Sequence, residues 1–183
     1  APLIGRIIDR RYRVLDCLGK GGMGVVYRVQ HVELGKILAI KVLSAGAGPD
    51  STMAARFKRE ARLVSKLSDP HTVQVFDYGV SDGVTWMVMQ LVSGSDLSRL
   101  LRKQGVFEAA RVAQVVDGVC RSLSEAHSLG IVHRDIKPEN VFLAEVHSAT
   151  ASRQVKVLDF GIAKLAAEAK DSGTGQVGTP LWM

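Results

Sequence analysis

Residues 133–140 read His-Arg-Asp-Ile-Lys-Pro-Glu-Asn and carry three groups that a phosphate-transfer site needs close together. Asp135 can accept a proton from a hydroxyl group, and Lys137 can neutralise the charge of a phosphate in transfer. Asn140 can offer its side-chain carbonyl oxygen to magnesium. A charged surface loop would be the better explanation for an isolated His-Arg-Asp. The full octapeptide predicts a site for phosphate transfer.

Length and composition limit the classes of protein to consider. The chain has 183 residues, 46% of them apolar, and a net charge of +6, which suits one sizeable core or two small lobes. The basic residues are scattered, without a basic run interleaved with aromatics, so we expect no nucleic-acid partner. No apolar run approaches the roughly 18 residues that cross a bilayer, and no signal peptide is evident. We therefore expect a cytoplasmic location and no membrane segment within residues 1–183.

The two cysteines, Cys17 and Cys120, are too few and too far apart for a disulfide framework or a zinc site. We expect both to be buried free thiols, which suits a reducing compartment.

A glycine-rich stretch follows a predicted strand over residues 12–18 and reads Gly-Lys-Gly-Gly-Met-Gly-Val-Val from residue 19. Glycines let a tight turn approach phosphate oxygens closely and offer backbone N–H groups as donors. A dinucleotide-binding loop shares this spacing but opens a helix. Here residues 25–29, Val-Val-Tyr-Arg-Val, continue as a strand. The stretch therefore predicts a hairpin whose loop covers phosphate.

Lys41 stands in the middle of an apolar strand predicted over residues 37–43. Buried lysines are almost always paired. A helix predicted to run from Ser51 or Thr52 to about residue 67 contains a single acid, Glu60, at the border of its apolar face. Glu60 can pair with Lys41, or with basic neighbours on its own helix. The apolar face of this helix consists of Met53, Phe57, Ala61 and Val64.

The remaining pattern predicts an α+β protein with two lobes, 1–92 and 93–183. Strands at 72–78 and 84–91 complete a five-stranded sheet lobe with one helix. The second lobe is mainly helical, with helices at 96–103 and 108–128 and strands at 141–143 and 155–158. We expect the long helix to bury Val112, Val116, Val119, Leu123 and Ala126.

In this order the motifs resemble the eukaryotic-type serine/threonine protein kinases, and the glycine-rich stretch is most similar to bacterial members. The resemblance covers residues 12–183 and includes Leu38-Ala39-Ile40-Lys41, which looks like the family's Val-Ala-Ile-Lys, and Asp159-Phe160-Gly161. It implies a two-lobed kinase fold and ATP-dependent phosphoryl transfer to serine or threonine hydroxyls of protein substrates, with ATP and Mg²⁺ as cofactors.

The resemblance also assigns roles to residues. The catalytic set is Asp135, Lys137, Lys41 and Glu60, and the metal ligands are Asn140 and Asp159. Met89 matches the gatekeeper position, and Gln90-Leu91-Val92 the hinge whose main chain bonds adenine. Phe160 is expected to pack with His133, Val64 and Val75. The ATP-binding set is Leu18, Gly19, Gly21, Gly22, Gly24, Val26, Ala39, Lys41, Met89, Gln90, Val92 and Phe142.

Regulation is expected at Arg134, which a phosphorylated Ser172 or Thr174 in the activation loop could bind, and Thr179 is counted with these regulatory residues. Lys137 together with Thr179 resembles the serine/threonine branch of the family. The chain stops at Met183, before the family's Ala-Pro-Glu, so we expect an incomplete domain that is weak or inactive by itself.

Two other classes of function compete with an enzyme. A non-catalytic nucleotide-binding regulatory module should lack at least one of Lys41, Asp135, Asn140 and Asp159, yet all four are present. A plain interaction domain should not bind magnesium-ATP.

Overall fold

The computed structural model describes residues 3–21, 24–43, 52–145 and 153–160, with the backbone alone for residues 52–56 and 60, and it divides into two units. The first unit comprises Ala1–Ser65 and Gln74–Leu91, and the second comprises Lys66–Val73 and Val92–Met183. The sequence predicted a single boundary between residues 92 and 93. In the structure, the segment Lys66–Val73 also belongs to the second unit.

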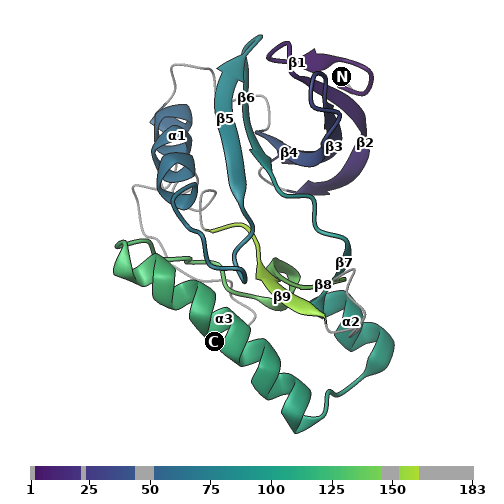
Figure 1. The fold of residues 1–183 in the computed structure, drawn as a ribbon, viewed down its shortest axis with the longest axis vertical. Helices are drawn as coiled ribbons and strands as arrows, with labels where there is room; N and C mark the ends of the chain where they lie inside the picture. The colour runs from purple at the N-terminus through teal and green to yellow at the C-terminus, as the bar shows by residue number, and fades with distance from the viewer. Residues whose placement is uncertain (1–2, 22–23, 44–51, 146–152, 161–183) are drawn as a thin grey trace, which may run out of the picture. The chain divides into compact units, whose positions relative to one another are not determined.

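The first unit is an antiparallel sheet of six strands in the order β1-β2-β3-β4-β6-β5, with one helix (Figure 1). The helix α1, Thr52–Val64, packs along β5. The predicted α+β class is confirmed, but the prediction of five strands missed β1, which is only two residues long. The strands are β1 (Ile7–Ile8), β2 (Tyr12–Gly21), β3 (Gly24–His31), β4 (Ile37–Leu43), β5 (Val75–Ser81) and β6 (Val84–Met89).

One face of this sheet buries the core of the first unit. Because side chains alternate along a strand, Leu38, Ile40 and Val42 of β4 enter the core, and Ala39 and Lys41 face the other way. The predicted apolar face of α1 is confirmed where its side chains are described. The buried members of that face are Phe57, Ala61 and Val64. The core itself consists of Ile8, Tyr12, Val14, Tyr27, Val29, Leu38, Ile40, Val42, Trp86 and Val88.

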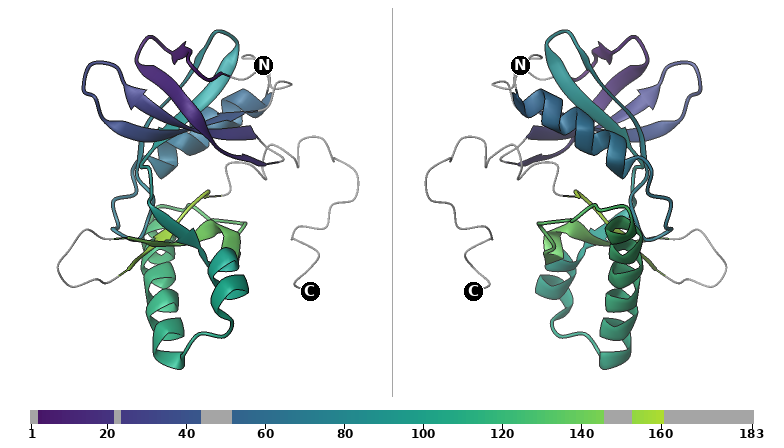
Figure 2. Two further views of the ribbon diagram at one scale, coloured as in Figure 1. Left: turned by 90° about the vertical axis from the view of Figure 1, so that its right-hand side faces the viewer. Right: turned by 90° about the vertical axis from the view of Figure 1, so that its left-hand side faces the viewer.

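The second unit contains a small antiparallel sheet and two helices that extend from the same side of it (Figure 2). Asp96 caps the first helix, because its Oδ1 accepts the Arg99 N–H at 2.7 Å. Within the described part of the chain, no helix is both long and apolar enough to cross a membrane. The elements are β7 (Gly94–Asp96), α2 (Leu97–Gln104), α3 (Ala109–Ser128), the short 3₁₀ helix η1 (Pro138–Asn140), β8 (Val141–Ala144) and β9 (Gln154–Val157).

The buried face of α3 differs from the prediction. Of the five residues predicted to be buried, Ala126 is buried, Val119 and Leu123 are partly buried, and Val112 and Val116 are 45% and 53% exposed. Val115, Gly118 and Ser122, which were not predicted, are also buried. The closest packing is made at Gly118, where a Cβ would lie 2.7 Å from Val155 Cβ and 2.9 Å from His71 Cδ2. Small residues therefore mark the inner face of α3, and the valine spacing pointed to a neighbouring face.

The prediction of buried thiols is also wrong, because Cys17 and Cys120 are both exposed free cysteines. Cys17 lies on β2 and Cys120 on α3.

Gly118→Ala should destabilise the protein although alanine favours a helix. Overpacking costs about 1–3 kcal/mol, and the gain in helix propensity is about 1 kcal/mol, so the free energy of unfolding should fall. Urea unfolding measures the change. Ser124→Ala, on the exposed face of the same helix, is the control and should not destabilise. Equal stability of Gly118→Ala and the wild type would show that α3 does not approach β9 so closely.

Candidate functional site

The second unit brings Asp135, Lys137 and Asn140 together. Lys137 Nζ lies 2.9 Å from Asp135 Oδ2. The Asn140 amide Nδ2 donates to Asp135 O at 2.8 Å and to Asp135 Oδ2 at 3.1 Å. Pro138 opens the 3₁₀ turn η1, which folds Asn140 back so that its N–H donates to Lys137 O. The side chains of Asp135 and Lys137 are partly exposed and can meet a substrate.

His133 supports this loop from the interior. It is 2% exposed, its Nε2–H donates to Leu158 O at 2.8 Å, and its Nδ1 accepts the Asp135 N–H at 3.3 Å. Both bonds suit a neutral ring. Burial lowers the pKa of His133, and the bond to Leu158 and the charges of Asp135 and Asp159 oppose this shift without cancelling it. The neutral ring therefore fixes the backbone of Asp135.

The ring of Phe160 packs against His133, with 4.7 Å between ring centroids. This part of the predicted stack is present. Val64 and Val75 belong to the first unit, and their place in the stack stays a prediction.

Asp159 lies just after β9, next to Leu158, which is hydrogen-bonded to the loop of residues 133–140. The Leu158 N–H donates to Asn140 O at 2.8 Å, and Leu158 O accepts from His133. Asp159 has a φ of 49° and Arg134 a φ of 62°, a left-handed conformation that non-glycine residues seldom adopt. Such backbone strain concentrates at functional sites. The sequence assigned roles to both residues without any signal of this conformation.

The first unit gathers part of the predicted ATP-binding set on the sheet face opposite its core. Val26 pairs with Lys41 across β3 and β4, and Ala39 pairs with Met89 across β4 and β6, so the four lie on one face. Lys41 is 8% exposed. The Glu60 side chain, its predicted partner, lies outside the described part of the structure.

The loop glycines differ in what they do for the fold. A Cβ at Gly24, where φ is 155°, would lie 2.1 Å from Val42 O, so the closeness of β3 and β4 requires this glycine. At Gly19 and Gly21 a Cβ would meet no described atom within 4 Å. The described neighbours therefore give no packing reason for these two glycines. Gly22 lies outside the described residues.

The rest of the predicted ATP-binding set is divided between the units. Leu18 lies on β2 and is 47% exposed. Gln90 donates its N–H to Gln74 O at 2.8 Å within the first unit. Val92 and Phe142 belong to the second unit, where Phe142 pairs with Asp96 and Lys156. That these residues contact one nucleotide stays a prediction.

The predicted regulatory residues are only partly covered by the structure. Arg134 is exposed. Ser172, Thr174 and Thr179 lie outside the described residues.

The donor set in the second unit fits a magnesium ion held together with phosphates. Asn140 and Asp159 supply amide and carboxylate oxygens, the hard ligands that Mg²⁺ prefers. Among the described residues, no group of three or more His, Cys, Asp or Glu could hold a metal alone. Mg²⁺ commonly binds one or two protein ligands and substrate phosphates, so a protein-only cage is not required.

One polar contact of the second unit was not singled out from the sequence. Glu125 of α3 accepts hydrogen bonds from Ser68 and Asp69. The spacing of Gly118, Ser122 and Glu125 along one helix face was the signal that could have revealed it.

His133 should make the protein less stable in mild acid. The unfolded chain takes up a proton near the ordinary pKa of 6.5, whereas the folded site resists protonation. Below about pH 6.5 the unfolded state binds more protons, so the free energy of unfolding falls as the pH drops.

Urea unfolding between about pH 7.5 and 5.5 measures this slope. His133→Phe keeps a ring beside Phe160 and should remove much of the slope. His127→Phe, at an exposed position, should leave it in place. An unchanged slope in His133→Phe would assign the acid sensitivity to another group.

Comparison with known proteins gives a consistent result. Residues 12–183 match the family described as protein kinase domain. The chain is 38% identical to serine/threonine-protein kinase pkn3 and 40% identical to pkn2, both of Myxococcus xanthus, over 98% and 96% of its length. It spans 34% and 21% of those two proteins. The crystal structure of the Mycobacterium tuberculosis PknI kinase domain is similar, with a TM-score of 0.75, 34% identity, and coverage of 89% of this chain and 64% of that one.

Proposed function

Because the chain belongs to the protein kinase domain family, we propose that it transfers the terminal phosphoryl group of ATP to serine or threonine hydroxyls of proteins. The curated relatives named above are serine/threonine kinases. The observation that carries the proposal is the cluster of Asp135, Lys137 and Asn140, in which a carboxylate lies 2.9 Å from an ammonium group. Phosphoryl transfer needs positioned groups more than covalent chemistry from the protein.

In the proposed reaction, the substrate hydroxyl oxygen forms a bond to the γ-phosphorus as the bond to the β,γ-bridging oxygen breaks. ADP leaves, and Asp135 accepts the hydroxyl proton. Lys137 stabilises the negative charge of the group in transfer. The Asn140 bond to Asp135 Oδ2 and the His133 bond to the Asp135 main chain hold the base in place.

We assign Asn140 and Asp159 to a magnesium ion that neutralises phosphate charge when it is bound. The Asn140 Nδ2 is used by Asp135, so Oδ1 is the atom of Asn140 that a cation would use. Asp159 contributes its carboxylate from an exposed position next to β9.

The first unit contributes nucleotide binding in this proposal. Lys41, paired with Glu60, contacts the phosphates, and the main chain of Gly19, Gly21 and Gly22 lies over them. The adenine contacts Leu18, Val26, Ala39 and Met89 of this unit, and Phe142, which belongs to the second unit, is assigned to the same ligand. The Gln90 N–H is already donated to Gln74 O, so we assign the contact of Gln90 with adenine to its carbonyl oxygen. We assign the second main-chain contact with adenine to Val92. A cytoplasmic location without nucleic-acid partners remains part of the proposal.

Labelled phosphate transfer tests this function. The full-length protein that carries this chain is incubated with γ-labelled ATP, magnesium and a generic basic protein, and the modified amino acids are identified. We expect label on serine or threonine, lost when the magnesium is chelated. Magnesium-ATP binding without transfer would instead support the regulatory module, and no binding would support an interaction domain.

A further inference from the structure

The connection between α2 and α3 forms a basic corner of the second unit. Both helices extend from the same side of the small sheet, so the loop that joins them lies at their far ends (Figure 2). We use the name basic corner for residues 97–112, which comprise α2, this loop and the first turn of α3. The corner has a single acid, Glu108. Its four basic residues are Arg99, Arg102, Lys103 and Arg111.

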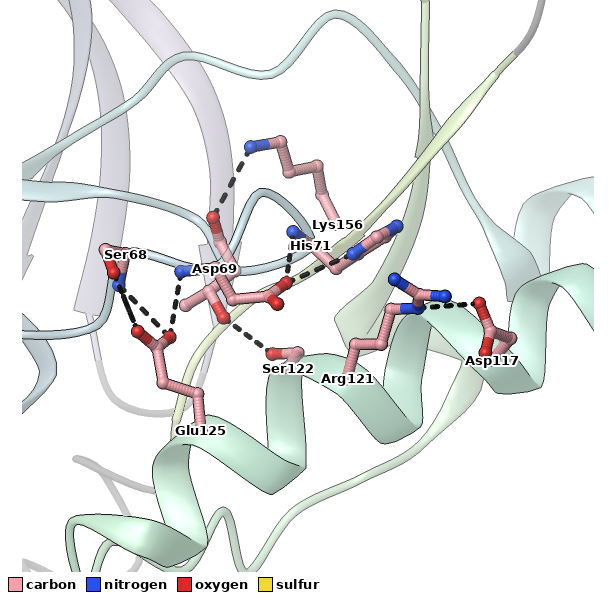
Figure 3. Close-up of polar contacts among 9 residues, drawn as sticks. Ser68, Asp69, His71, Asp117, Arg121, Ser122, Glu125 and Lys156 are labelled. Atoms are coloured by element: carbon pink, nitrogen blue, oxygen red, sulfur yellow. Dashed lines mark hydrogen bonds and ion pairs between the residues drawn. The ribbon is translucent and has the colours of Figure 1, made fainter.

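The positive charge of the corner is not neutralised by neighbouring carboxylates. The three basic side chains of α2 are exposed, and Arg102 Nη1 donates to the uncharged Ser98 hydroxyl at 2.7 Å. Asp96, just before the corner, is used to cap α2. Among the described residues, no carboxylate forms an ion pair with a basic residue of the corner. Arg121, further along α3, differs because Asp117 Oδ2 accepts its Nε–H at 2.9 Å (Figure 3).

The loop holds a cation and an apolar side chain at the tip of the corner. Arg111 Cζ lies 4.1 Å from the centre of the Phe107 ring, and Arg111 Nη1 donates to Gln104 Oε1 at 3.0 Å. Phe107 packs against the core of the second unit, so this arginine is fixed in place. Next to Phe107, Val106 is 97% exposed, and Leu101 at the end of α2 is 40% exposed. Val106 therefore adds no packing to the described fold.

An anionic membrane surface fits this combination of groups. Arginine and lysine side chains are attracted to lipid phosphates, and an apolar side chain among them can enter the boundary between headgroups and acyl chains. Arg99 and Arg102 are three positions apart and share one face of α2. Because the corner projects from the unit, a flat surface can contact this face and the loop together (Figure 2). An extended acidic peptide could pair with the cations but would leave Val106 unused.

We propose that the basic corner docks the protein on an anionic lipid bilayer. Arg102, Lys103 and Arg111 contact the lipid phosphates, and Val106 enters the interface. Docking of this kind holds the protein against one side of a membrane and does not cross it. The inference goes beyond phosphoryl transfer and does not depend on it, because the corner contains no residue assigned to ATP, magnesium or proton transfer.

Vesicle sedimentation with the full-length protein that carries this chain tests the proposal. Vesicles of phosphatidylcholine with about one third phosphatidylglycerol are compared with vesicles of phosphatidylcholine alone. We expect the wild type to bind the anionic vesicles more tightly, and this preference should weaken as salt is raised from about 0.1 to 0.5 M. Arg102→Gln/Lys103→Gln should bind the anionic vesicles about 10-fold more weakly or worse, since each basic residue near the surface contributes about fivefold.

Arg28→Gln/Arg121→Gln is the control matched in net charge. Both arginines are exposed, and each is paired with a carboxylate outside the corner, Arg28 with Asp16 and Arg121 with Asp117. This variant should bind the anionic vesicles as the wild type does. All four substituted side chains are exposed, so both double variants should keep the wild-type melting temperature.

Val106→Asn separates a membrane from an acidic polypeptide. Loss of the apolar side chain should weaken binding to the anionic vesicles about threefold or more. Leu34→Asn is its control, because Leu34 is 73% exposed in a turn of the first unit, and its affinity should not change.

Three results would overturn the proposal. The wild type could bind both kinds of vesicle equally or bind neither. Arg102→Gln/Lys103→Gln could bind the anionic vesicles as tightly as the wild type or as its charge-matched control does. Finally, the same variant could lose binding to polyglutamate and keep binding to vesicles, which would make an acidic protein the partner of the corner.

Discussion

Asp135→Asn should lower the turnover of phosphate transfer by about 100-fold or more and leave ATP affinity nearly unchanged. The asparagine keeps the size of the side chain but cannot accept the proton of the substrate hydroxyl. It also loses the ion pair with Lys137, which lies 2.9 Å from Asp135 Oδ2. Steady-state phosphorylation of a basic protein gives kcat, and calorimetric titration with magnesium-ATP gives the affinity.

Asp117→Asn provides the control, since it removes one carboxylate from the exposed surface of α3. That variant should keep the wild-type kcat. If Asp135→Asn transferred phosphate at the wild-type rate, Asp135 would not be the base.

Asp159→Asn should abolish most of the stabilisation that magnesium-ATP gives the protein. A ligand present at about 100 times its Kd stabilises the folded state by about 2.7 kcal/mol, so the expected loss is readily seen in a thermal melt. Asparagine tolerates the left-handed backbone that Asp159 adopts at a φ of 49°. The backbone is therefore preserved, and the effect reports the missing carboxylate charge.

Asp82→Asn is the control for this substitution, because Asp82 has a φ of 51° in the turn between β5 and β6. That variant should keep the full shift with magnesium-ATP. If Asp159→Asn kept the same shift as the wild type, the assignment of Asp159 to the metal would be wrong.

The parts of the fold that repeat a simple pattern could be predicted from the sequence. The strand of residues 37–43 was predicted with the bounds that β4 has, because an apolar run flanked by turn residues has few alternatives. The buried positions of α1 followed from helical spacing. The loop of residues 133–140 was predicted from the chemistry of its side chains, and the structure brings three of them together.

Other parts depend on contacts between distant residues, which a pattern does not reveal. The inner face of α3 is set by the close approach of Gly118 to Val155 and His71, so two valines expected inside are exposed. The two-residue strand β1 is too short to show alternation. The segment Lys66–Val73 joins the second unit through Glu125 and Ser122, which are more than 45 positions away along the chain.

The positions of polar groups within the site also needed the structure. The sequence placed Asp159 and Arg134 by motif, but it gave no sign of the left-handed backbone that both residues adopt. Their neighbours Leu158 and His133 are hydrogen-bonded to each other. The loop glycines were all assigned to phosphate, whereas Gly24 has a packing reason as well. Spacing alone does not distinguish a glycine that a ligand needs from one that the sheet needs.

The most direct test of the proposed phosphoryl transfer counts both products in the same sample. The full-length protein that carries this chain is incubated with magnesium-ATP and a protein substrate, and ADP and phosphorylated serine or threonine are measured together. We predict one phosphorylated hydroxyl for each ADP formed, with both products lost in Asp135→Asn. ADP without phosphorylated protein, or ATP that stays bound and intact, would contradict the account.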